Sequence, residues 1–106
     1  MDRFGDIPHS VENLLKIAAI RALAHRAYVT EVVINRQEVR LTMYQKARLR
    51  VEKIPDLVRS YKGDLKLVPG DVPSFHYIDR RNKNQDSLEM MGKAEEILKD
   101  IYGIRI

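Results

Sequence analysis

Apolar side chains recur every three or four residues through the first part of the chain, which is the spacing of an α-helix. They are Val11, Leu14, Leu15, Ile17, Ala18, Ile20, Ala22, Leu23 and Ala24. These positions cover a wider face than the seam of a coiled coil does. We therefore predict a long helix from about Pro8 to Ala27 that is buried over much of its circumference. Pro8 suits its first turn, where a missing N–H costs nothing.

Two later parts of the chain have the pattern of β-hairpins, with strands that are rich in β-branched residues or that alternate between apolar and polar residues. The first hairpin is predicted to pair residues 29–35 with residues 39–43. The second is predicted to pair residues 64–68 with residues 74–78, across a five-residue loop that contains proline and glycine.

The stretch between the two hairpins allows two interpretations. Ala47, Leu49 and Val51 alternate with Lys46, Arg48 and Arg50, so a continued strand and a loop both fit residues 45–53. After it, Pro55 precedes apolar residues at helical spacing, and Gly63 follows them. This pattern predicts a short helix from about residue 54 to residue 62.

The end of the chain has the pattern of an amphipathic helix. Asp86 and Glu89 resemble a capping box, apolar residues then recur at helical spacing, and Gly103 is a natural C-cap. We predict a helix over residues 86–102. The order helix, hairpin, short helix, hairpin, helix predicts one α+β domain over residues 1–106. In it, a small antiparallel sheet of two hairpins packs with a long N-terminal helix, a short middle helix and a C-terminal helix.

Composition narrows the class of protein further. Apolar residues make up 44% of the 106 residues and charged residues 32%, as in ordinary globular domains. No apolar run reaches the roughly 20 residues that span a bilayer, and no secretory signal is recognisable, so we expect a cytoplasmic protein without a membrane partner. The absence of cysteine rules out disulfides and thiolate sites. The net charge of +4 comes from 19 basic and 15 acidic residues that are interleaved, which favours a mixed, solvated surface.

The candidate residues for catalysis or cofactor binding do not form a recognisable site. The glycines are scattered and none precedes Lys-Ser or Lys-Thr, so no phosphate-binding loop is present. The three histidines, His9, His25 and His76, lack the spacing of a metal site. Ser74, His76 and Asp79 can be combined into a hydrolase-like triple, but a chain of this size offers such triples by chance. We expect no catalysis, no cofactor and no metal.

Basic residues form two clusters that are candidates for contact with nucleic acid. The denser cluster consists of Lys46, Arg48, Arg50 and Lys53, and the second contains Arg80, Arg81 and Lys83. On a strand, residues 46, 48 and 50 would share one face and could follow a phosphate backbone. Aromatic residues for base stacking are scarce nearby. A small nucleic-acid-binding module that uses this basic strand is the alternative function.

The most specific pattern is the start of the chain, Asp2-Arg3-Phe4-Gly5-Asp6-Ile7-Pro8, which runs into Val11-Glu12-Asn13-Leu14-Leu15. It resembles the signature of the C-terminal TRCF domain of the transcription-repair coupling factors, the bacterial Mfd family, and the resemblance is dense over residues 2–24. In that family the signature lies deep in a much longer polypeptide. The resemblance therefore implies the later part of a C-terminal regulatory domain, with Met1 as an expression start.

The resemblance also implies a function. Members of the family are ATP-dependent DNA translocases that release stalled RNA polymerase and recruit UvrA for nucleotide excision repair, with the motor in other domains. Their C-terminal domain docks on the UvrA-recruiting module of the same polypeptide and masks it. UvrA, RNA polymerase and DNA are thus indirect partners.

Asp2 and Arg3 match polar positions of this docking contact, while an acidic residue expected a few positions upstream is absent. The alternative interpretation of the same residues is structural. In it, Arg3 and Asp6 are surface residues at the start of the helix, and Phe4 fills the core.

Overall fold

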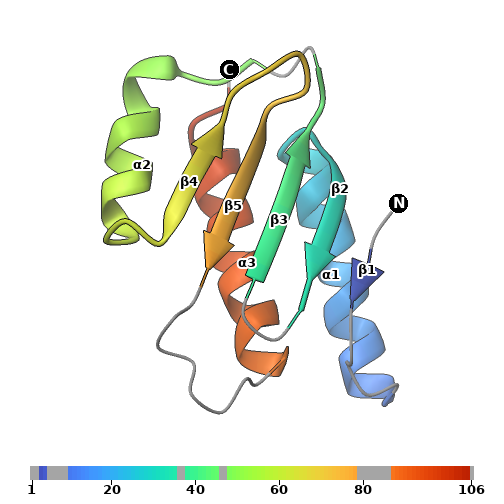
Figure 1. The fold of residues 1–106 in the computed structure, drawn as a ribbon. Helices are drawn as coiled ribbons and strands as arrows, with labels where there is room; N and C mark the ends of the chain where they lie inside the picture. Colours follow the sequence, from blue (N-terminus) through green and yellow to red (C-terminus); the bar gives the residue numbers. More distant parts are fainter. Residues whose placement is uncertain (1–2, 5–9, 36–37, 46–47, 79–86, 106) are drawn as a thin grey trace.

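The computed structural model describes residues 3–4, 10–35, 38–45, 48–78 and 87–105. The predicted order of elements is confirmed, and a short first strand is added to it (Figure 1). The elements are β1 (Arg3–Phe4), α1 (Val11–Arg26), β2 (Val29–Ile34), β3 (Glu38–Met43), the 3₁₀ turn η1 (Val51–Lys53), α2 (Ile54–Ser60), β4 (Leu65–Val68), β5 (Ser74–Ile78) and α3 (Ser87–Gly103).

The two predicted hairpins form and join into one sheet with the strand order β1-β2-β3-β5-β4. The three pairs β2/β3, β3/β5 and β5/β4 are antiparallel. The hairpins meet where β3 pairs with β5, with Val39 opposite Tyr77 and Leu41 opposite Phe75. β1 adds to the outer edge of β2 in parallel.

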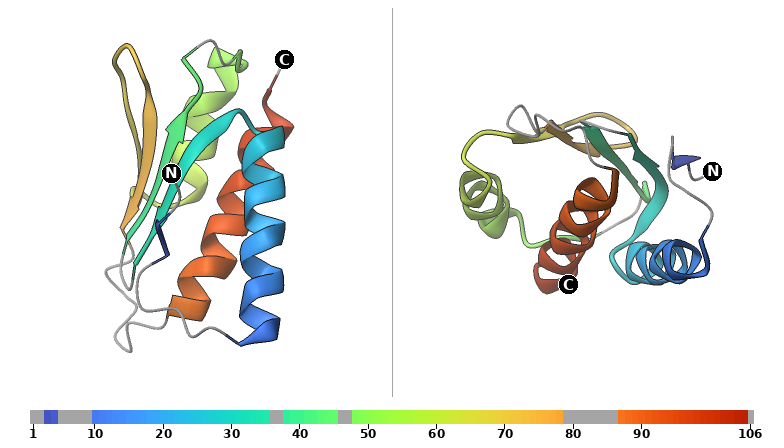
Figure 2. Two further views of the ribbon diagram at one scale, coloured as in Figure 1. Left: turned by 90° about the vertical axis from the view of Figure 1, so that its right-hand side faces the viewer. Right: turned by 90° about the horizontal axis from the view of Figure 1, so that it is seen from below.

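All three helices cover the same face of this sheet, as Figure 2 shows. The alternation of buried and more exposed residues in β3 and β5 directs Val39, Leu41, Met43, Phe75 and Tyr77 into the core beneath the helices. α3 contributes the largest set of buried side chains. They are Met90, Met91, Ala94, Ile97, Leu98 and Ile101. The result is the two-layer α+β architecture that the sequence predicts.

A β-bulge adjusts the first hairpin so that its apolar residues reach the core. Val29 lies opposite Met43, but the next pair joins Glu31 to Thr42, so Thr30 is the additional residue. One extra residue reverses the alternation of the strand. Val29, Val32 and Ile34 are consequently all buried.

α1 begins later than predicted. Its first residue is Val11, and Ser10 is the N-cap, with its hydroxyl accepting a 3.2 Å hydrogen bond from the backbone N–H of Asn13. The prediction of a start near Pro8 was therefore wrong by about three residues, because the serine supplies the cap that a helix start needs. Pro8 itself lies outside the described residues.

The predicted burial of α1 was also wrong. Its buried residues are Asn13, Ile20 and Ala24, whereas Val11 is 76% exposed and Leu15 is 67% exposed. α1 lies at the edge of the helix layer, beside α3 and over β2 (Figure 2). Neighbours therefore cover only one side of the helix, and the apolar residues on its other side face solvent.

The stretch between the hairpins is a loop rather than a continued strand. Its described part makes one isolated antiparallel bridge, between Leu49 and Arg105, and then turns into η1. The backbone N–H of Arg50 donates a 2.7 Å hydrogen bond to the carbonyl of Ile104. Ile104 and Arg105, rather than a neighbouring strand, therefore pair with this loop.

The other two helices form close to their predicted bounds. α2 ends at Ser60, two residues before the predicted end, where Lys62 and Gly63 take the left-handed φ angles of 54° and 86°. The structure describes α3 from Ser87, so Asp86 lies outside the described residues.

Candidate interaction surfaces

The signature segment contributes an edge strand to the sheet. Arg3 pairs with Val33 and Phe4 with Ile34, parallel to β2. This pairing covers the outer edge of β2 at Val33 and Ile34, which would otherwise be a free edge there. Arg3 therefore lies in a strand rather than at the start of the helix, which corrects the structural alternative for this residue. Asp2, Gly5 and Asp6 lie outside the described residues.

The described part of the basic stretch lies in a loop and a 3₁₀ turn rather than in a continued strand. Arg48, Arg50 and Lys53 are exposed, but they lie on the loop and on η1. Lys46 is outside the described residues, as are Arg80, Arg81 and Lys83. The physical reason is that the loop pairs with the chain end at a single position, Leu49.

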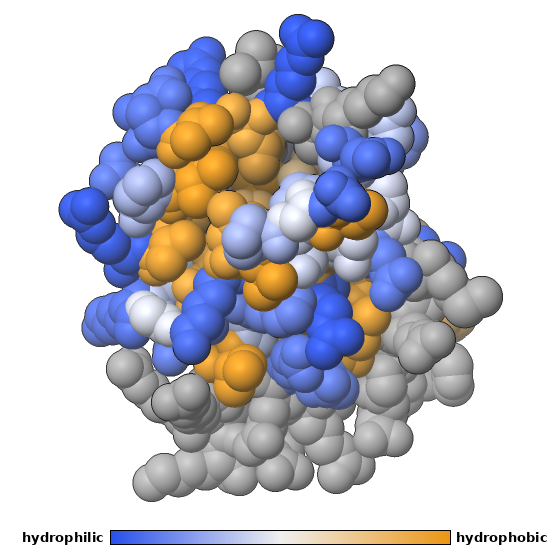
Figure 3. Space-filling view, turned by 45° about the horizontal axis from the view of Figure 1, so that its top comes forward, coloured by the Kyte–Doolittle hydropathy of each residue, from blue (hydrophilic) through white to orange (hydrophobic). Residues whose placement is uncertain are grey.

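An apolar groove lies beside this basic stretch. Its volume is about 300 Å³, and it lies between the loop before α2 and the ends of β3, β4 and β5. The residues that line it are Met43, Arg48, Leu49, Val51, Ile54, Leu67, Pro73 and Phe75. Figure 3 shows apolar side chains gathered on this part of the surface. Arg48 therefore borders a groove suited to an apolar side chain. The alternation that includes Leu49 and Val51 does not predict this groove, because the groove also depends on residues of β3, β4 and β5.

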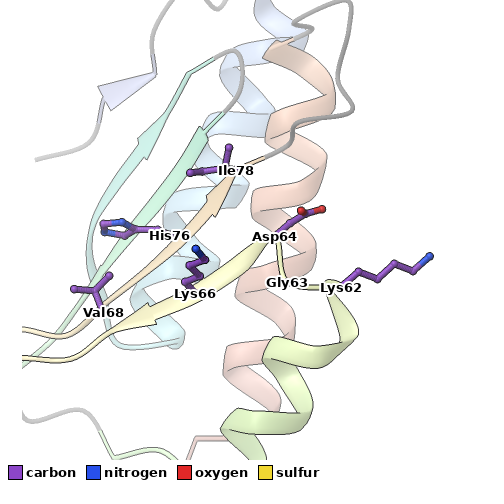
Figure 4. Close-up of a pocket in the computed structure, with 7 residues that line it drawn as sticks. All are labelled: Lys62, Gly63, Asp64, Lys66, Val68, His76 and Ile78. Carbon is purple, nitrogen blue, oxygen red and sulfur yellow. The ribbon is translucent and has the colours of Figure 1, made fainter.

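The face of the sheet opposite the helices carries a row of polar side chains beside the exposed Val68 and Ile78. The pairing register places Arg40, His76 and Lys66 in one row across β3, β5 and β4. Arg40 forms an ion pair with Glu38 at 3.1 Å. A shallow pocket of about 250 Å³ includes His76 and Lys66, which project from this face together with Val68 (Figure 4).

The hydrolase-like triple is brought together only in part. Ser74 Oγ and His76 Nε2 are 3.0 Å apart on the open face. Asp79 lies outside the described residues, as does His9, and His25 is exposed at the end of α1. Over the described ranges, no group of three or more histidine, aspartate or glutamate residues could hold a metal ion.

Within the described part of the chain, one titratable group with a clearly displaced pKa, Tyr61, joins two helices. Burial raises the pKa of the Tyr61 hydroxyl, and a hydrogen bond to Asp100 raises this pKa further. The hydroxyl donates this 2.6 Å bond from the end of α2 to α3, and the Tyr61 ring meets the Tyr77 ring edge-on at 5.9 Å. The displaced pKa therefore reflects a packing contact between elements.

Comparison with known families supports the resemblance of the signature. The TRCF domain model matches residues 1–54, which is 54 of 106 residues and covers β1, α1, β2, β3 and η1. Among curated proteins none matches, and the same holds among solved structures. No described helix is long and apolar enough to cross a membrane. The chain therefore belongs to the TRCF domain family, a domain of the transcription-repair coupling factors that act in DNA repair.

Proposed function

We propose that this chain is a non-catalytic, autoinhibitory part of the C-terminal domain of a transcription-repair coupling factor. It would cover the UvrA-recruiting module of the same polypeptide until RNA polymerase is engaged. The observation that carries this proposal is the family match over residues 1–54, which includes the signature segment. The parent protein would be an ATP-dependent DNA translocase with its motor in other domains, and UvrA, RNA polymerase and DNA would be its partners.

The contact is assigned to Asp2 and Arg3. The backbone of Arg3 pairs with Val33 at the edge of a five-stranded sheet, which supports its use as a contact residue. A guanidinium group binds carboxylates in a planar, two-pronged geometry, which suits a specific contact with an acidic residue of the masked module. Masking requires only a few kcal/mol of preference for the covered state. Shifting the ratio of covered to uncovered molecules from about 1:99 to 99:1 needs about 5.5 kcal/mol.

The experiment measures UvrA binding to the full-length coupling factor in the absence of RNA polymerase. Arg3→Glu and Asp2→Lys should each raise UvrA affinity, because each reverses a charge in the masking contact and shifts the population toward the uncovered state. Lys99→Glu is the matched control, because Lys99 is exposed on α3, away from β1, and carries the same charge change as Arg3→Glu. An affinity that stays equal to that of the unsubstituted protein would remove Asp2 and Arg3 from the interface.

The alternative function is nucleic-acid binding by Lys46, Arg48, Arg50 and Lys53. The exposure of the three described members of this set supports it. Phosphate contacts release counterions, so this function predicts that log K falls steeply with log salt, by about 0.9 for each contact with duplex DNA. A titration of DNA binding against salt distinguishes the two functions, because the masking function predicts no such slope for the isolated chain.

A further inference from the structure

Three of the five tyrosines lie outside the fully buried core, and the fold brings them to one end of the molecule. Tyr61 and Tyr77 are buried, whereas Tyr28 is half-buried, Tyr44 is 47% exposed and Tyr102 is 44% exposed. Tyr28 follows α1, Tyr44 follows β3, and Tyr102 is in the last turn of α3. The ends of α1 and α3 lie at the same end of the molecule (Figure 2). Tyr28, Tyr44 and Tyr102 therefore form a tyrosine cluster that their distant positions in the sequence do not predict.

Short contacts join the members of the tyrosine cluster. The backbone N–H of Tyr44 donates a 2.6 Å hydrogen bond to the carbonyl of Tyr28. The same two residues, with His25, line part of a hollow of about 260 Å³. The guanidinium group of Arg105 lies 5.3 Å from the ring centre of Tyr28 and 4.7 Å from that of Tyr102. One arginine thus lies against two of the three rings.

Tyr28 keeps a large side chain at a backbone position that favours glycine. Its φ angle is 61°, in the left-handed region that bulky residues rarely adopt. Residues in such conformations are concentrated at binding and active sites, where the side chain is needed despite the strain. The backbone at Tyr28 therefore marks this end of the molecule as a candidate binding site, independently of its charge.

The basic stretch reaches the tyrosine cluster through the chain end. Leu49 forms its isolated bridge with Arg105, and the backbone N–H of Arg50 donates a 2.7 Å hydrogen bond to the carbonyl of Ile104. The side chain of Arg105 also donates a 2.5 Å hydrogen bond to the carbonyl of Arg26, the last residue of α1. Arginines from three distant parts of the sequence therefore meet beside the tyrosines.

The segments that meet at this end carry an excess of positive charge. They are residues 25–30, 44–45, 48–53 and 102–105. Together they contain five arginine and lysine residues but only one acidic residue, Glu52. Four of the five basic residues are exposed, and Arg105 is half-buried. A polyanion would therefore be attracted to this end of the molecule.

The described residues within four positions of these segments do not cancel the excess, because they balance one another. The acidic ones are Glu31, Asp56 and Asp100, and the basic ones are Arg21, Arg40 and Lys99. Asp100 also accepts the hydrogen bond of Tyr61. An uncharged partner at this end would remove the cations from water without compensation, which is costly. Whatever covers this surface must therefore supply negative charge.

We propose that this end of the molecule binds single-stranded nucleic acid, with the arginines contacting phosphates and the tyrosines stacking on unpaired bases. Aromatic rings beside cationic groups are how proteins bind single strands without sequence preference. An acidic protein segment would match the charge but would not explain why exposed rings gather here. A duplex would also match the charge, but it keeps the faces of its bases inside the stack.

This inference goes beyond the masking function. It rests on the alternative function, nucleic-acid binding by the basic stretch, and it names the substrate class and adds the tyrosine cluster to the site. The two surfaces do not overlap, because β1 pairs with Val33 and Ile34 at the end of β2, whereas Tyr28 directly precedes the start of β2. One domain can therefore carry both functions.

Fluorescence anisotropy with two labelled probes tests the proposal on the 106-residue chain. The first probe is an oligothymidylate of about 12 nucleotides, and the second is an abasic oligomer with the same sugars and phosphates. The oligothymidylate should bind at least about tenfold more tightly, because only this probe has bases that can stack. Equal affinities would overturn the stacking proposal but leave binding by the basic stretch intact. Absence of binding to both probes would overturn both.

The salt dependence tests the phosphate contacts. Each contact with a single strand lowers log K by about 0.7 for each unit of log salt, so three to five contacts predict a slope of about −2 to −3.5. Both probes should give this slope, because they have the same phosphates. Binding of the oligothymidylate that does not change with salt would overturn the role of the arginines.

Tyrosine variants test the stacking itself. Tyr44→Ala and Tyr102→Ala should each weaken binding of the oligothymidylate at least about fivefold and leave binding of the abasic oligomer unchanged. Leu14→Ala is the matched control, because Leu14 is 49% exposed but lies in the first turn of α1, and it should change neither. Equal weakening of both probes by the tyrosine variants would overturn the stacking role. Circular dichroism verifies that each variant is folded.

A charge variant and a third probe separate nucleic acid from an acidic protein. Arg50→Gln should weaken both oligomers, whereas Lys66→Gln, on β4, should weaken neither. Equal effects of the two substitutions would show a general effect of net charge and would contradict a site. Poly-glutamate of similar charge should bind at least about tenfold more weakly than the oligothymidylate. Poly-glutamate that binds as tightly would indicate an acidic protein partner and would overturn the proposal.

Discussion

The hydroxyl of Tyr61 donates a 2.6 Å hydrogen bond to Oδ2 of Asp100, and this bond joins the end of α2 to α3. The Tyr61 ring is buried, and it contacts the ring of Tyr77 in β5. One side chain therefore connects the short middle helix, the C-terminal helix and the sheet. This contact fixes α2 at the edge of the helix layer, where the apolar groove lies.

Tyr61→Phe tests this connection. The substitution keeps the ring in the core and removes only the hydroxyl, so the free energy of unfolding should fall by about 0.5 to 1.5 kcal/mol. Urea unfolding monitored by circular dichroism measures the change. Tyr44→Phe is the control, because Tyr44 is 47% exposed, and it should have little effect. Equal effects of the two substitutions would contradict a specific role of the bond to Asp100.

The same residue predicts how stability depends on pH. Burial and the neighbouring Asp100 raise the pKa of Tyr61 in the folded protein, whereas the unfolded chain has a tyrosine pKa near 10. The folded state therefore holds the proton more tightly. The contribution of Tyr61 is complete below about pH 10 and is lost as the pH rises above that value. The unfolding free energy of Tyr61→Phe should fall less steeply than that of the unsubstituted protein between about pH 9 and pH 11; parallel curves would contradict the raised pKa.

Arg105 provides a second connection, between the chain end and the end of α1. Its guanidinium group lies 5.3 Å from the ring centre of Tyr28 and 4.7 Å from that of Tyr102, and it donates a 2.5 Å hydrogen bond to the carbonyl of Arg26. Arg105→Ala should lower the unfolding free energy by about 1 to 2 kcal/mol, since each exposed cation–π contact is worth about 0.5 to 1 kcal/mol.

Arg105→Lys separates geometry from charge. It retains the charge but loses the planar group, so it should recover only part of the stability. Full recovery of the unfolding free energy in the lysine variant would show that charge alone accounts for the contact.

Substitutions on the two sides of α1 should differ in their effect on the free energy of unfolding. Ile20 is fully buried, so Ile20→Ala should cost about 2 to 5 kcal/mol of unfolding free energy. Leu15 is 67% exposed, so Leu15→Gln should change this free energy by less than about 0.5 kcal/mol. Chemical unfolding at about 1 µM measures both. A large loss of unfolding free energy on Leu15→Gln would show that the exposed side of α1 contributes to the core.

The sequence predicted the elements whose pattern depends on neighbours along the chain. The alternation of Val39, Leu41 and Met43 located β3 within its hairpin, and Pro55 located the start of α2. These predictions succeeded because a strand with one covered face and a helix with a proline in its first turn have distinctive local patterns.

The features that the sequence did not predict depend on distant contacts. β1 consists of two residues, too few for a periodic pattern, and it exists because β2 offers a free edge. The burial predicted for Val11 and Leu15 is wrong, because periodicity shows that a helix is apolar on a given face but not whether a neighbour covers that face. The isolated bridge of Leu49 depends on Arg105, which lies at the far end of the chain.

The central claim is that this chain covers the UvrA-recruiting module through its signature segment. Isothermal titration of the 106-residue chain against the isolated UvrA-recruiting module of the parent protein tests it most directly. The account predicts saturable binding that Arg3→Glu abolishes and that Lys99→Glu leaves unchanged. No binding at concentrations up to about 1 mM, or binding that Arg3→Glu leaves intact, would contradict it.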